Sequence, residues 1–182
     1  MKIEKVEKKV KMTEGVSAEL KGTILVIKGP KGEISYDFPS KRVLVAIGSG
    51  EMLVTSQNVT KREKTLIGTY VAHIKNMMRG VVEPFVYKLK VCASHFPMTV
   101  KIDNGVLTVK NFIGEAVPRK LKLKEGADVK VDGQEITVIA VSKETAGQVA
   151  ADIEQLTKRP GFDRRIFQDG IYITQKDKKQ MA

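Results

Sequence analysis

The sequence contains little of what stabilises secreted or membrane proteins. It has one cysteine, Cys92, no tryptophan, and only 5% aromatic residues in a chain of 182. A single thiol excludes an intrachain disulfide and a cysteine-based zinc cluster. No stretch approaches 18 consecutive apolar residues, and the Lys/Glu-rich first dozen residues predict neither a signal peptide nor an anchor. We therefore expect a cytoplasmic protein without a membrane partner.

Motifs for catalysis and cofactor binding are also missing. The two histidines, His73 and His95, have no carboxylate or cysteine at metal-ligand spacing, and no glycine-rich phosphate loop precedes a helix. The segment Gly29–Gly32 matches the sequence pattern of the GxxG clamp of KH domains, but here it is predicted to join two strands rather than two helices. The sequence therefore predicts no enzymatic activity, no cofactor, no metal and no small-molecule substrate.

Positive charge is abundant and unevenly placed. The formal net charge is +11 and the pI about 9.7, which favours a polyanionic partner such as RNA, DNA or an acidic membrane surface. Residues 83–157 carry ten basic and ten acidic side chains, whereas residues 158–182 carry seven basic and three acidic ones. The first 82 residues have 15 basic and eight acidic side chains. The C-terminal segment is therefore the first candidate for a phosphate-binding surface.

An internal duplication organises the chain. TILVIKGPKGE at residues 23–33 aligns with GVLTVKNFIGE at 105–115 with an offset of 82, and GTYVAHI at 68–74 aligns with GQVAADI at 147–153 with an offset of 79. Each copy has the pattern of several strands followed by one helix. We therefore predict an α+β fold of two tandem similar domains, each with antiparallel sheets packed on one helix. The predicted bounds are 1–82 and 83–182.

Hairpins and helices can be placed within each copy. Hairpins are expected at residues 24–38, at 99–110 and at 129–138, the last with Asp132-Gly133 as its two-residue loop. Thr60 and Glu63 form a capping-box pattern before an apolar stripe through Ile67, Tyr70 and Ile74, and Ser142 is expected to cap the second helix. Gly80 and Gly161 are read as helix stop signals.

The segment Arg164–Lys176, RRIFQDGIYITQK, has two possible roles. Asp169-Gly170 predicts a tight turn leading into a strand, and that strand could complete a core or present basic and aromatic side chains to nucleic acid. We expect a division by residue. Ile166, Phe167, Ile171 and Ile173 should anchor the strand, holding the basic residues and Tyr172 outward. The lysines after residue 175 could also be a solvated tail.

Three motifs in order make the chain similar to a known family. SHFPM at residues 94–98, NFIGE at 111–115 followed by Arg119, and RIFQDGIYI at 165–173 resemble the archaeal and eukaryotic type of the large ribosomal subunit protein six family. The resemblance runs from about residue 15 to 177. It implies a structural constituent of the large subunit that binds large-subunit rRNA near the stalk base and the sarcin–ricin region. The neighbouring large-subunit proteins at the stalk base are the expected protein partners.

The resemblance also implies where rRNA is contacted. The family binds RNA chiefly through its second domain and C-terminal element, which corresponds here to residues 158–176. The residues expected to contact rRNA are Lys158, Arg159, Arg164, Arg165, Tyr172, Lys176, Lys178, Lys179, Arg119 and Lys120. The sequence Lys158–Asp163, with Pro160-Gly161, departs from the linker expected for the family, so the path of this loop stays open. The alternative function is a free regulatory or chaperone-like module that binds proteins through its sheet edges.

Overall fold

The computed structural model describes residues 3–48, 50–163 and 165–181. The chain divides into two compact units, Met1–Pro84 and Phe85–Ala182. The division lies two residues after the expected domain bounds of 1–82 and 83–182. Residues 83 and 84 stay with the first unit because the Glu83 N–H donates a hydrogen bond to the Arg79 carbonyl at 2.7 Å. Within the described ranges, no helix is long and apolar enough to cross a membrane.

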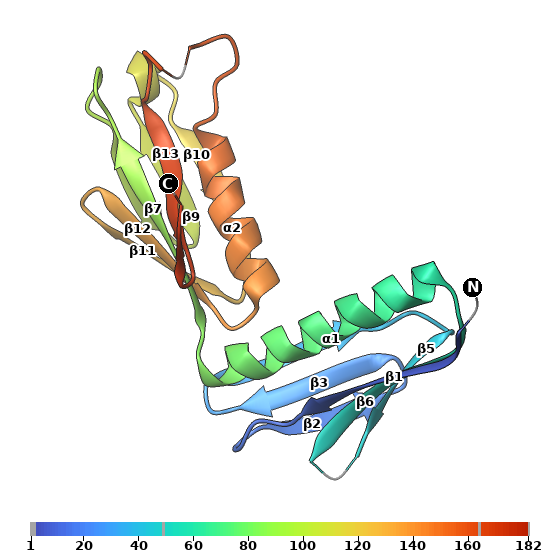
Figure 1. The fold of residues 1–182 in the computed structure, drawn as a ribbon. Helices are drawn as coiled ribbons and strands as arrows, with labels where there is room; N and C mark the ends of the chain where they lie inside the picture. Colours follow the sequence, from blue (N-terminus) through green and yellow to red (C-terminus); the bar gives the residue numbers. More distant parts are fainter. Residues whose placement is uncertain (1–2, 49, 164, 182) are drawn as a thin grey trace. The chain divides into compact units, whose positions relative to one another are not determined.

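The first unit packs one helix against two small antiparallel sheets (Figure 1). The sheets have the strand orders β1-β6-β5 and β2-β3-β4. The elements are β1 Ile3–Lys11, β2 Ser17–Lys21, β3 Ile24–Gly29, β4 Gly32–Asp37, β5 Val43–Ile47, β6 Glu51–Val59 and α1 Lys61–Val82. The expected hairpin of residues 24–38 is β3–β4.

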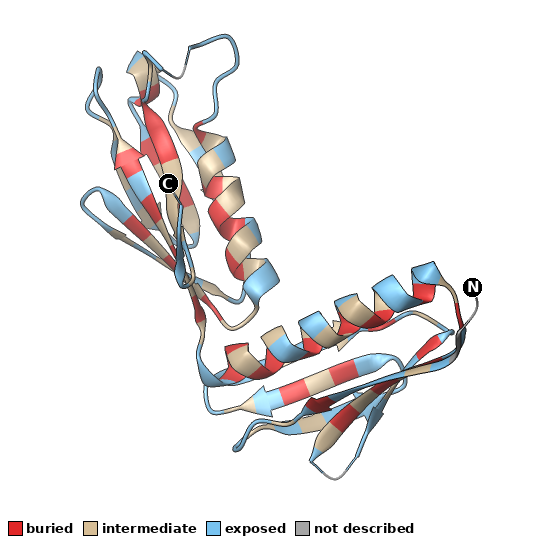
Figure 2. Ribbon diagram, viewed as in Figure 1, coloured by how far each residue is buried: buried red, intermediate tan, exposed pale blue. Residues whose placement is uncertain are grey.

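Helix α1 buries the predicted apolar stripe. Ile67 and Ile74 are fully buried and Tyr70 is nearly so, and Figure 2 shows the buried residues recurring along one side of the helix. The prediction that Gly80 ends the helix is wrong, because α1 continues to Val82 and Gly80 is buried inside it. A glycine alone does not stop a helix whose next residue, Val81, is drawn into the core. Pro84 follows shortly after the actual end.

The start of α1 is fixed by the predicted capping pair. The Glu63 carboxylate accepts hydrogen bonds from the Thr60 hydroxyl and, at 3.0 Å, from the Thr60 N–H. The Arg42 guanidinium donates to the same carboxylate at 3.0 Å. The hydrogen bonds from Thr60, followed by that from Arg42, lower the pKa of Glu63 to about 2.

Glu63→Gln is expected to reduce the dependence of stability on acid pH. Because the folded pKa lies below the unfolded value of about 4.3, the carboxylate stabilises the fold above that pH, and this contribution is lost as pH falls toward 2. Urea unfolding at pH 7 and pH 2.5 should show a smaller difference between the two midpoints in the variant. Glu19→Gln, at an exposed position on β2, is the control. An unchanged difference in the Glu63 variant would contradict this role.

The second unit repeats this architecture and extends it. Its sheets have the orders β10-β9-β8 and β11-β12-β7-β13-β14, and one helix packs on them (Figure 1). The elements are β7 Phe85–Cys92, β8 Thr99–Asp103, β9 Val106–Lys110, the 3-10 helix Phe112–Gly114, β10 Arg119–Lys122, β11 Ala127–Asp132, β12 Glu135–Ala140, α2 Lys143–Leu156, β13 Gly170–Lys176 and β14 Lys179–Gln180. The predicted α+β class with two similar tandem domains is confirmed.

The two units correspond strand by strand until α2 ends. β1 and β7 each open a unit and pair with the strand that leads into the helix, β6 or β12. The buried helix positions coincide at the predicted offset of 79, as Ile67 with Ala146 and Ile74 with Ile153. β13 and β14 follow the completed repeat: β13 adds to the outer edge of β7, and β14 pairs with β13.

Local details of the second unit follow the sequence with one shift. The Ser142 hydroxyl accepts from the Thr145 N–H at 3.3 Å, as expected for a helix cap. The predicted loop Asp132-Gly133 is wrong by one residue, because Asp132 pairs with Glu135 and the two-residue loop is Gly133-Gln134. Gly133 has φ of 56°, which a side chain would disfavour. This register keeps the apolar residues of both strands on one face.

Candidate functional site

The tail of the second unit is one loop followed by a strand. We call residues 158–169 the tail loop; it joins α2 to β13. The strand predicted after Asp169-Gly170 is present, but no turn forms at this pair: Gly170 is the first residue of β13, which pairs with β7. Gly170 has φ of 153°, and a Cβ there would lie 3.3 Å from the Tyr172 hydroxyl. Glycine is therefore required where the loop enters the sheet.

Asp169 fastens the tail loop to the segment after β7. Its buried carboxylate accepts hydrogen bonds from the Ser94 N–H at 2.6 Å and the His95 N–H at 3.1 Å. His95 Nδ1 lies 2.5 Å from the same carboxylate. Burial alone would raise the pKa of Asp169, but the hydrogen bonds from His95 and Ser94 outweigh it and hold that pKa below its usual range. A charged Asp169 is thus the anchor of the loop.

Aromatic rings surround this anchor in tilted and edge-to-face contacts. Phe167 lies 4.9 Å from the His95 ring and 5.2 Å from the Phe162 ring, measured between centroids. The Arg159 guanidinium lies 4.7 Å from the centre of the Phe162 ring. The prediction that Ile166 anchors the strand to the core is wrong: it is 66% exposed, because the loop turns there before β13 begins. Ile171 is buried, as predicted.

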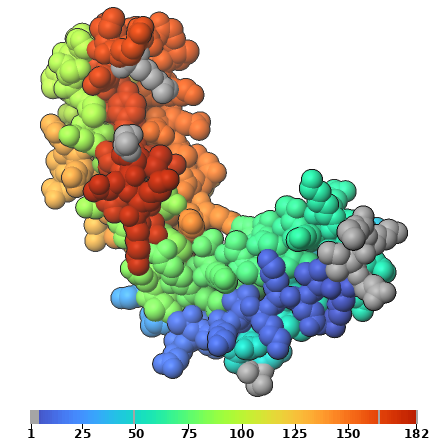
Figure 3. Space-filling model, in the orientation of Figure 1, coloured from blue at the N-terminus to red at the C-terminus, as the bar shows by residue number. Residues whose placement is uncertain are grey.

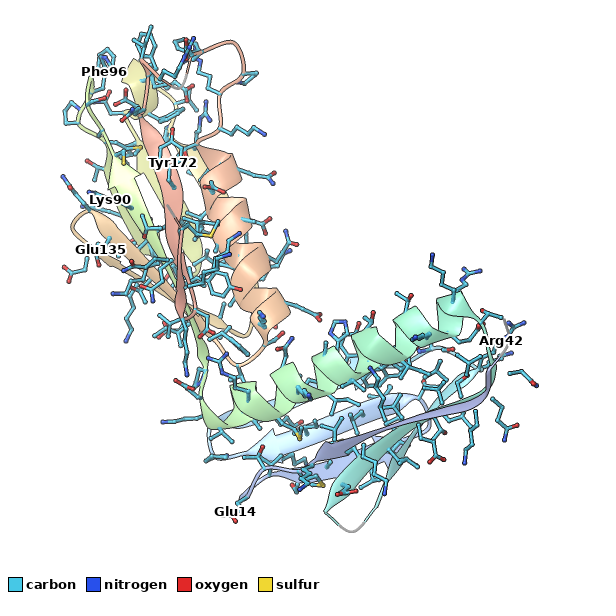
Figure 4. The ribbon with its side chains drawn as sticks, viewed as in Figure 1. Glu14, Arg42, Lys90, Phe96, Glu135 and Tyr172 are labelled. Atoms are coloured by element: carbon cyan, nitrogen blue, oxygen red, sulfur yellow. The ribbon has the colours of Figure 1, made fainter. Side chains whose placement is uncertain are left out.

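A cleft opens between the tail loop, the end of α2 and β13. Its volume is about 240 Å³. Two predicted cations, Lys158 and Arg159, line it together with Tyr172, which Figure 4 labels on β13. The other lining residues are Ile113, Glu154, Gln155, Thr157, Phe162, Phe167, Asp169 and Ile171. The cleft therefore combines cations, carboxylates, ring faces and amide or hydroxyl groups. Its cations and ring faces are groups that can bind the phosphates and bases of nucleotides.

Arg119 makes several contacts within the second unit. Its guanidinium donates to the Glu115 carboxylate at 2.7 and 2.8 Å and to the Leu156 carbonyl at 2.7 Å. It also lies 4.4 Å over the Phe112 ring. The hydrogen bonds from Arg119 lower the pKa of Glu115, whose Oε1 also lies 3.8 Å from the Arg159 guanidinium. Arg119 thus holds the C-terminal end of α2 and a carboxylate that positions Arg159.

Arg165 lies on the outside of the loop. Arg165 is exposed and donates to Asp163 through Nη2 at 2.7 Å and through its N–H at 2.9 Å. This hydrogen-bonded pair raises the pKa of Arg165 and lowers that of Asp163. The guanidinium is therefore oriented while most of its surface faces water. Arg164 lies outside the described residues.

The remaining predicted residues lie apart from the cleft. Lys176 and Lys179 pair with each other across the β13–β14 hairpin, and Lys178 is in its turn. They are about 20 Å along the strand from Gly170, by the rise of an extended chain. Lys120 is exposed on β10. Figure 3 shows the red atoms of the C-terminal segment gathered on one face of the second unit. The structure thus gathers Lys158, Arg159 and Tyr172 in one cleft and separates the hairpin lysines from it.

Serine, histidine and aspartate meet at the anchor without forming a catalytic triad. Ser94 Oγ lies 3.1 Å from His95 Nδ1, the same ring nitrogen that faces Asp169. A triad needs the carboxylate on one ring nitrogen and the nucleophile on the other. In the described part of the chain, no group of three or more His, Cys, Asp or Glu side chains is arranged to hold a metal ion. Ser94, His95 and Asp169 instead form a clamp that holds the tail loop to the segment after β7.

Sequence reasoning missed this clamp. His95 has no carboxylate near it along the chain, yet Asp169 reaches it from 74 residues away. Phe162 was not assigned a role, although it forms one wall of the cleft. The available signal was that SHFPM and RIFQDGIYI are two of the motifs that carry the family resemblance. Phe96, in the first of them, lies at the same end of the unit as the tail loop (Figure 4).

Comparison with known proteins shows the family. A family model described as "Ribosomal protein L6" matches residues 13–83 and 96–170. "Large ribosomal subunit protein uL6" of Methanosarcina mazei is 41% identical over 174 residues, covering 96% of this chain and 99% of that protein. The proteins of the same name from Methanobrevibacter smithii and Ignicoccus hospitalis are 38% and 41% identical, covering 94% and 90% of this chain and 97% and 91% of their own lengths. The duplicated α+β fold and these matches over both repeats place the chain in the ribosomal protein L6 family.

Proposed function

We propose that the chain is a non-enzymatic, structural constituent of the large ribosomal subunit that binds large-subunit rRNA through the tail cleft. Membership of the ribosomal protein L6 family supports the first part, and the relatives are named as large-subunit proteins. This membership favours a ribosomal constituent over the alternative, a free regulatory or chaperone-like module. In this proposal the protein works in the ribosome of the cytoplasm.

The cleft is the observation that carries the RNA-binding part. Lys158 and Arg159 supply charge for phosphates, and Phe162 and Tyr172 offer rings to bases or riboses. Residues 158–182, which supply most of the lining, have a net charge of +4. The two carboxylates of the lining, Glu154 and Asp169, accept hydrogen bonds from backbone N–H groups within the chain. The contacts we propose read RNA shape through phosphate and 2′-hydroxyl groups rather than base sequence.

Several residues predicted to contact rRNA lie outside the cleft and have supporting roles in this proposal. Arg165 faces outward next to the cleft and adds a guanidinium oriented by Asp163. Lys176, Lys178 and Lys179 form a second group of cations at the far hairpin, for a phosphate further along the RNA. Arg119 acts by positioning Arg159 through Glu115. Arg164 and Lys120 stay predictions from the sequence.

The proposed location is the stalk base, near the sarcin–ricin region, with neighbouring large-subunit proteins around it. It is tested by directed hydroxyl-radical cleavage. An iron chelate is attached at Gln168→Cys, an exposed position in the tail loop, in a Cys92→Ala chain assembled into large subunits. We expect the rRNA cuts to fall in the sarcin–ricin region. A chelate at Lys130→Cys on β11 is the matched control and should give different cuts. Cuts from position 168 that fall elsewhere would refute the location.

A further inference from the structure

The outer edge of β1 is a second candidate interaction surface. Among the described residues, β1 pairs with β6 on one side and with no strand on the other. Its counterpart β7 pairs with β12 on one side and with β13 on the other. The two repeats therefore differ at this sheet edge. In the second unit β13 covers the edge of β7, whereas in the first unit no described strand covers the edge of β1.

The backbone of β1 is oriented for such a strand. The Met12 N–H donates to the Gly50 carbonyl at 2.9 Å, and the register pairs Val10 with Met52. In an antiparallel ladder alternate residues bond to the same neighbour, so Lys9 and Lys11 direct their N–H and C=O groups away from β6. Lys5 and Glu7, four and two residues before Lys9, also direct their backbone groups away from β6.

The same alternation holds in β7, where the edge is in use. The Val91 N–H donates to the Gln134 carbonyl on the inner side. Lys88 and Lys90 therefore face β13, and the Thr174 hydroxyl donates to the Lys88 carbonyl at 3.1 Å. Both edges thus present the backbone of alternating residues, many of them lysines.

A groove runs between the β1 edge and the end of α1. Its volume is about 560 Å³, and its apolar part comprises Val10, Met78 and Val82. Val82 is 37% exposed there. In the second unit Ile171 of β13, 1% exposed, contacts the core, and its N–H donates to Thr157, the counterpart of Met78. An added strand in the first unit would likewise cover an apolar side chain.

The charges around the groove define its occupant. Lys9, Lys11, Lys75 and Arg79 line it, with Glu83 and Thr13 as the other polar residues. At the offset of 79, Lys75 takes the place of Glu154, whose carboxylate accepts from the Ile173 N–H at 3.2 Å. The charge at this helix position is therefore positive in the first unit and negative in the second. A second copy of β1, with four lysines and two glutamates, would add net positive charge beside these cations, whereas a strand with acidic side chains would be attracted.

We propose that this groove binds an extended segment of another protein of the large subunit, which adds as a strand to the outer edge of β1. The segment alternates apolar and acidic residues, with an apolar side chain over Val82 and carboxylates facing Lys9 and Lys75. It does for the first unit what β13 does for the second. This inference uses the proposed function only for the place where the partner is found, and it does not depend on the tail cleft.

The test is a photocrosslink from the groove in intact large subunits. The chain is assembled with p-benzoylphenylalanine in place of Val82, and the crosslinked product is identified by mass spectrometry. We expect a peptide of another ribosomal protein with alternating apolar and acidic residues. A crosslink to rRNA, to the chain's own second unit, or to no other molecule would overturn the proposal.

Hydrogen exchange supplies a second readout on the unmodified protein. The amides of Glu7, Lys9 and Lys11 should exchange at least about 100-fold more slowly in the subunit than in the free chain, because a paired strand protects them. The amides of Lys8 and Val10, which already face β6, should change less and serve as the control. Unprotected Glu7, Lys9 and Lys11 amides in the subunit would exclude strand addition. Such a result would leave the rRNA cleavage pattern from position 168 unaffected.

Discussion

Replacing Lys158 and Arg159 together by glutamate is expected to weaken binding to an rRNA fragment containing the sarcin–ricin region by about 100-fold. Each position contributes on the order of a factor of ten, because in the proposed complex the change removes a cation that faces a phosphate and introduces a repulsion. The plot of log affinity against log salt should also become shallower by about one unit for each phosphate that the protein no longer neutralises. Filter binding at three or more salt concentrations measures both quantities.

A matched pair separates local contact from general charge. Lys101→Glu with Lys130→Glu changes the net charge by the same amount, at exposed positions on β8 and β11. This pair should lower affinity far less. Unchanged circular dichroism and unfolding midpoints in both variants would show that the fold persists. Equal reductions of affinity in the two pairs would mean that the cleft is not the binding site.

Asp169→Ala is expected to lower rRNA affinity by about ten-fold even though it removes a negative charge. Electrostatics alone would predict tighter binding, since the net charge becomes more positive. We expect the opposite, because the carboxylate holds Ser94 and His95 and so fixes the loop that carries Lys158, Arg159 and Phe167. A loosened loop must be ordered on binding, at about 1–2 kcal/mol for each residue that is fixed.

The same substitution should also destabilise the second unit, by about 1–3 kcal/mol, because it removes the hydrogen bonds of a buried carboxylate. In the native chain this contribution is present above the unfolded pKa of aspartate and is lost as pH falls through the lower folded pKa. Asp103→Asn, at an exposed position on β8, removes a similar charge without touching the clamp. If Asp169→Ala bound rRNA as tightly as Asp103→Asn, the clamp would have no part in binding.

Local patterns and the repeat made most of the architecture predictable. The stripe through Ile67 and Ile74 and the caps at Thr60 and Ser142 depend on neighbours within one or two turns, so the sequence displays them. The offset of 79 between the helices holds in the buried positions. The prediction that Gly80 ends α1 was wrong because the packing of Val81 outweighs the weak helix propensity of glycine.

The site was less predictable because its contacts join distant segments. The Asp169 carboxylate meets Ser94 and His95 across more than 70 residues, and no periodic pattern encodes such a contact. Ile166 is apolar and next to a strand, yet the loop geometry leaves it exposed. Arg119 reads as one more cation in the sequence, while its three hydrogen bonds show that it supports the helix end.

In the proposed function, rRNA is held by the tail loop and β13 of the second unit. Ultraviolet crosslinking of intact large subunits, followed by mass spectrometry of the peptides joined to RNA, tests it most directly. We expect crosslinked residues within 158–176, at Phe162, Phe167 or Tyr172 and at the nearby Lys158. Crosslinks confined to the first unit or to β10 and β11, with none between residues 158 and 176, would contradict it.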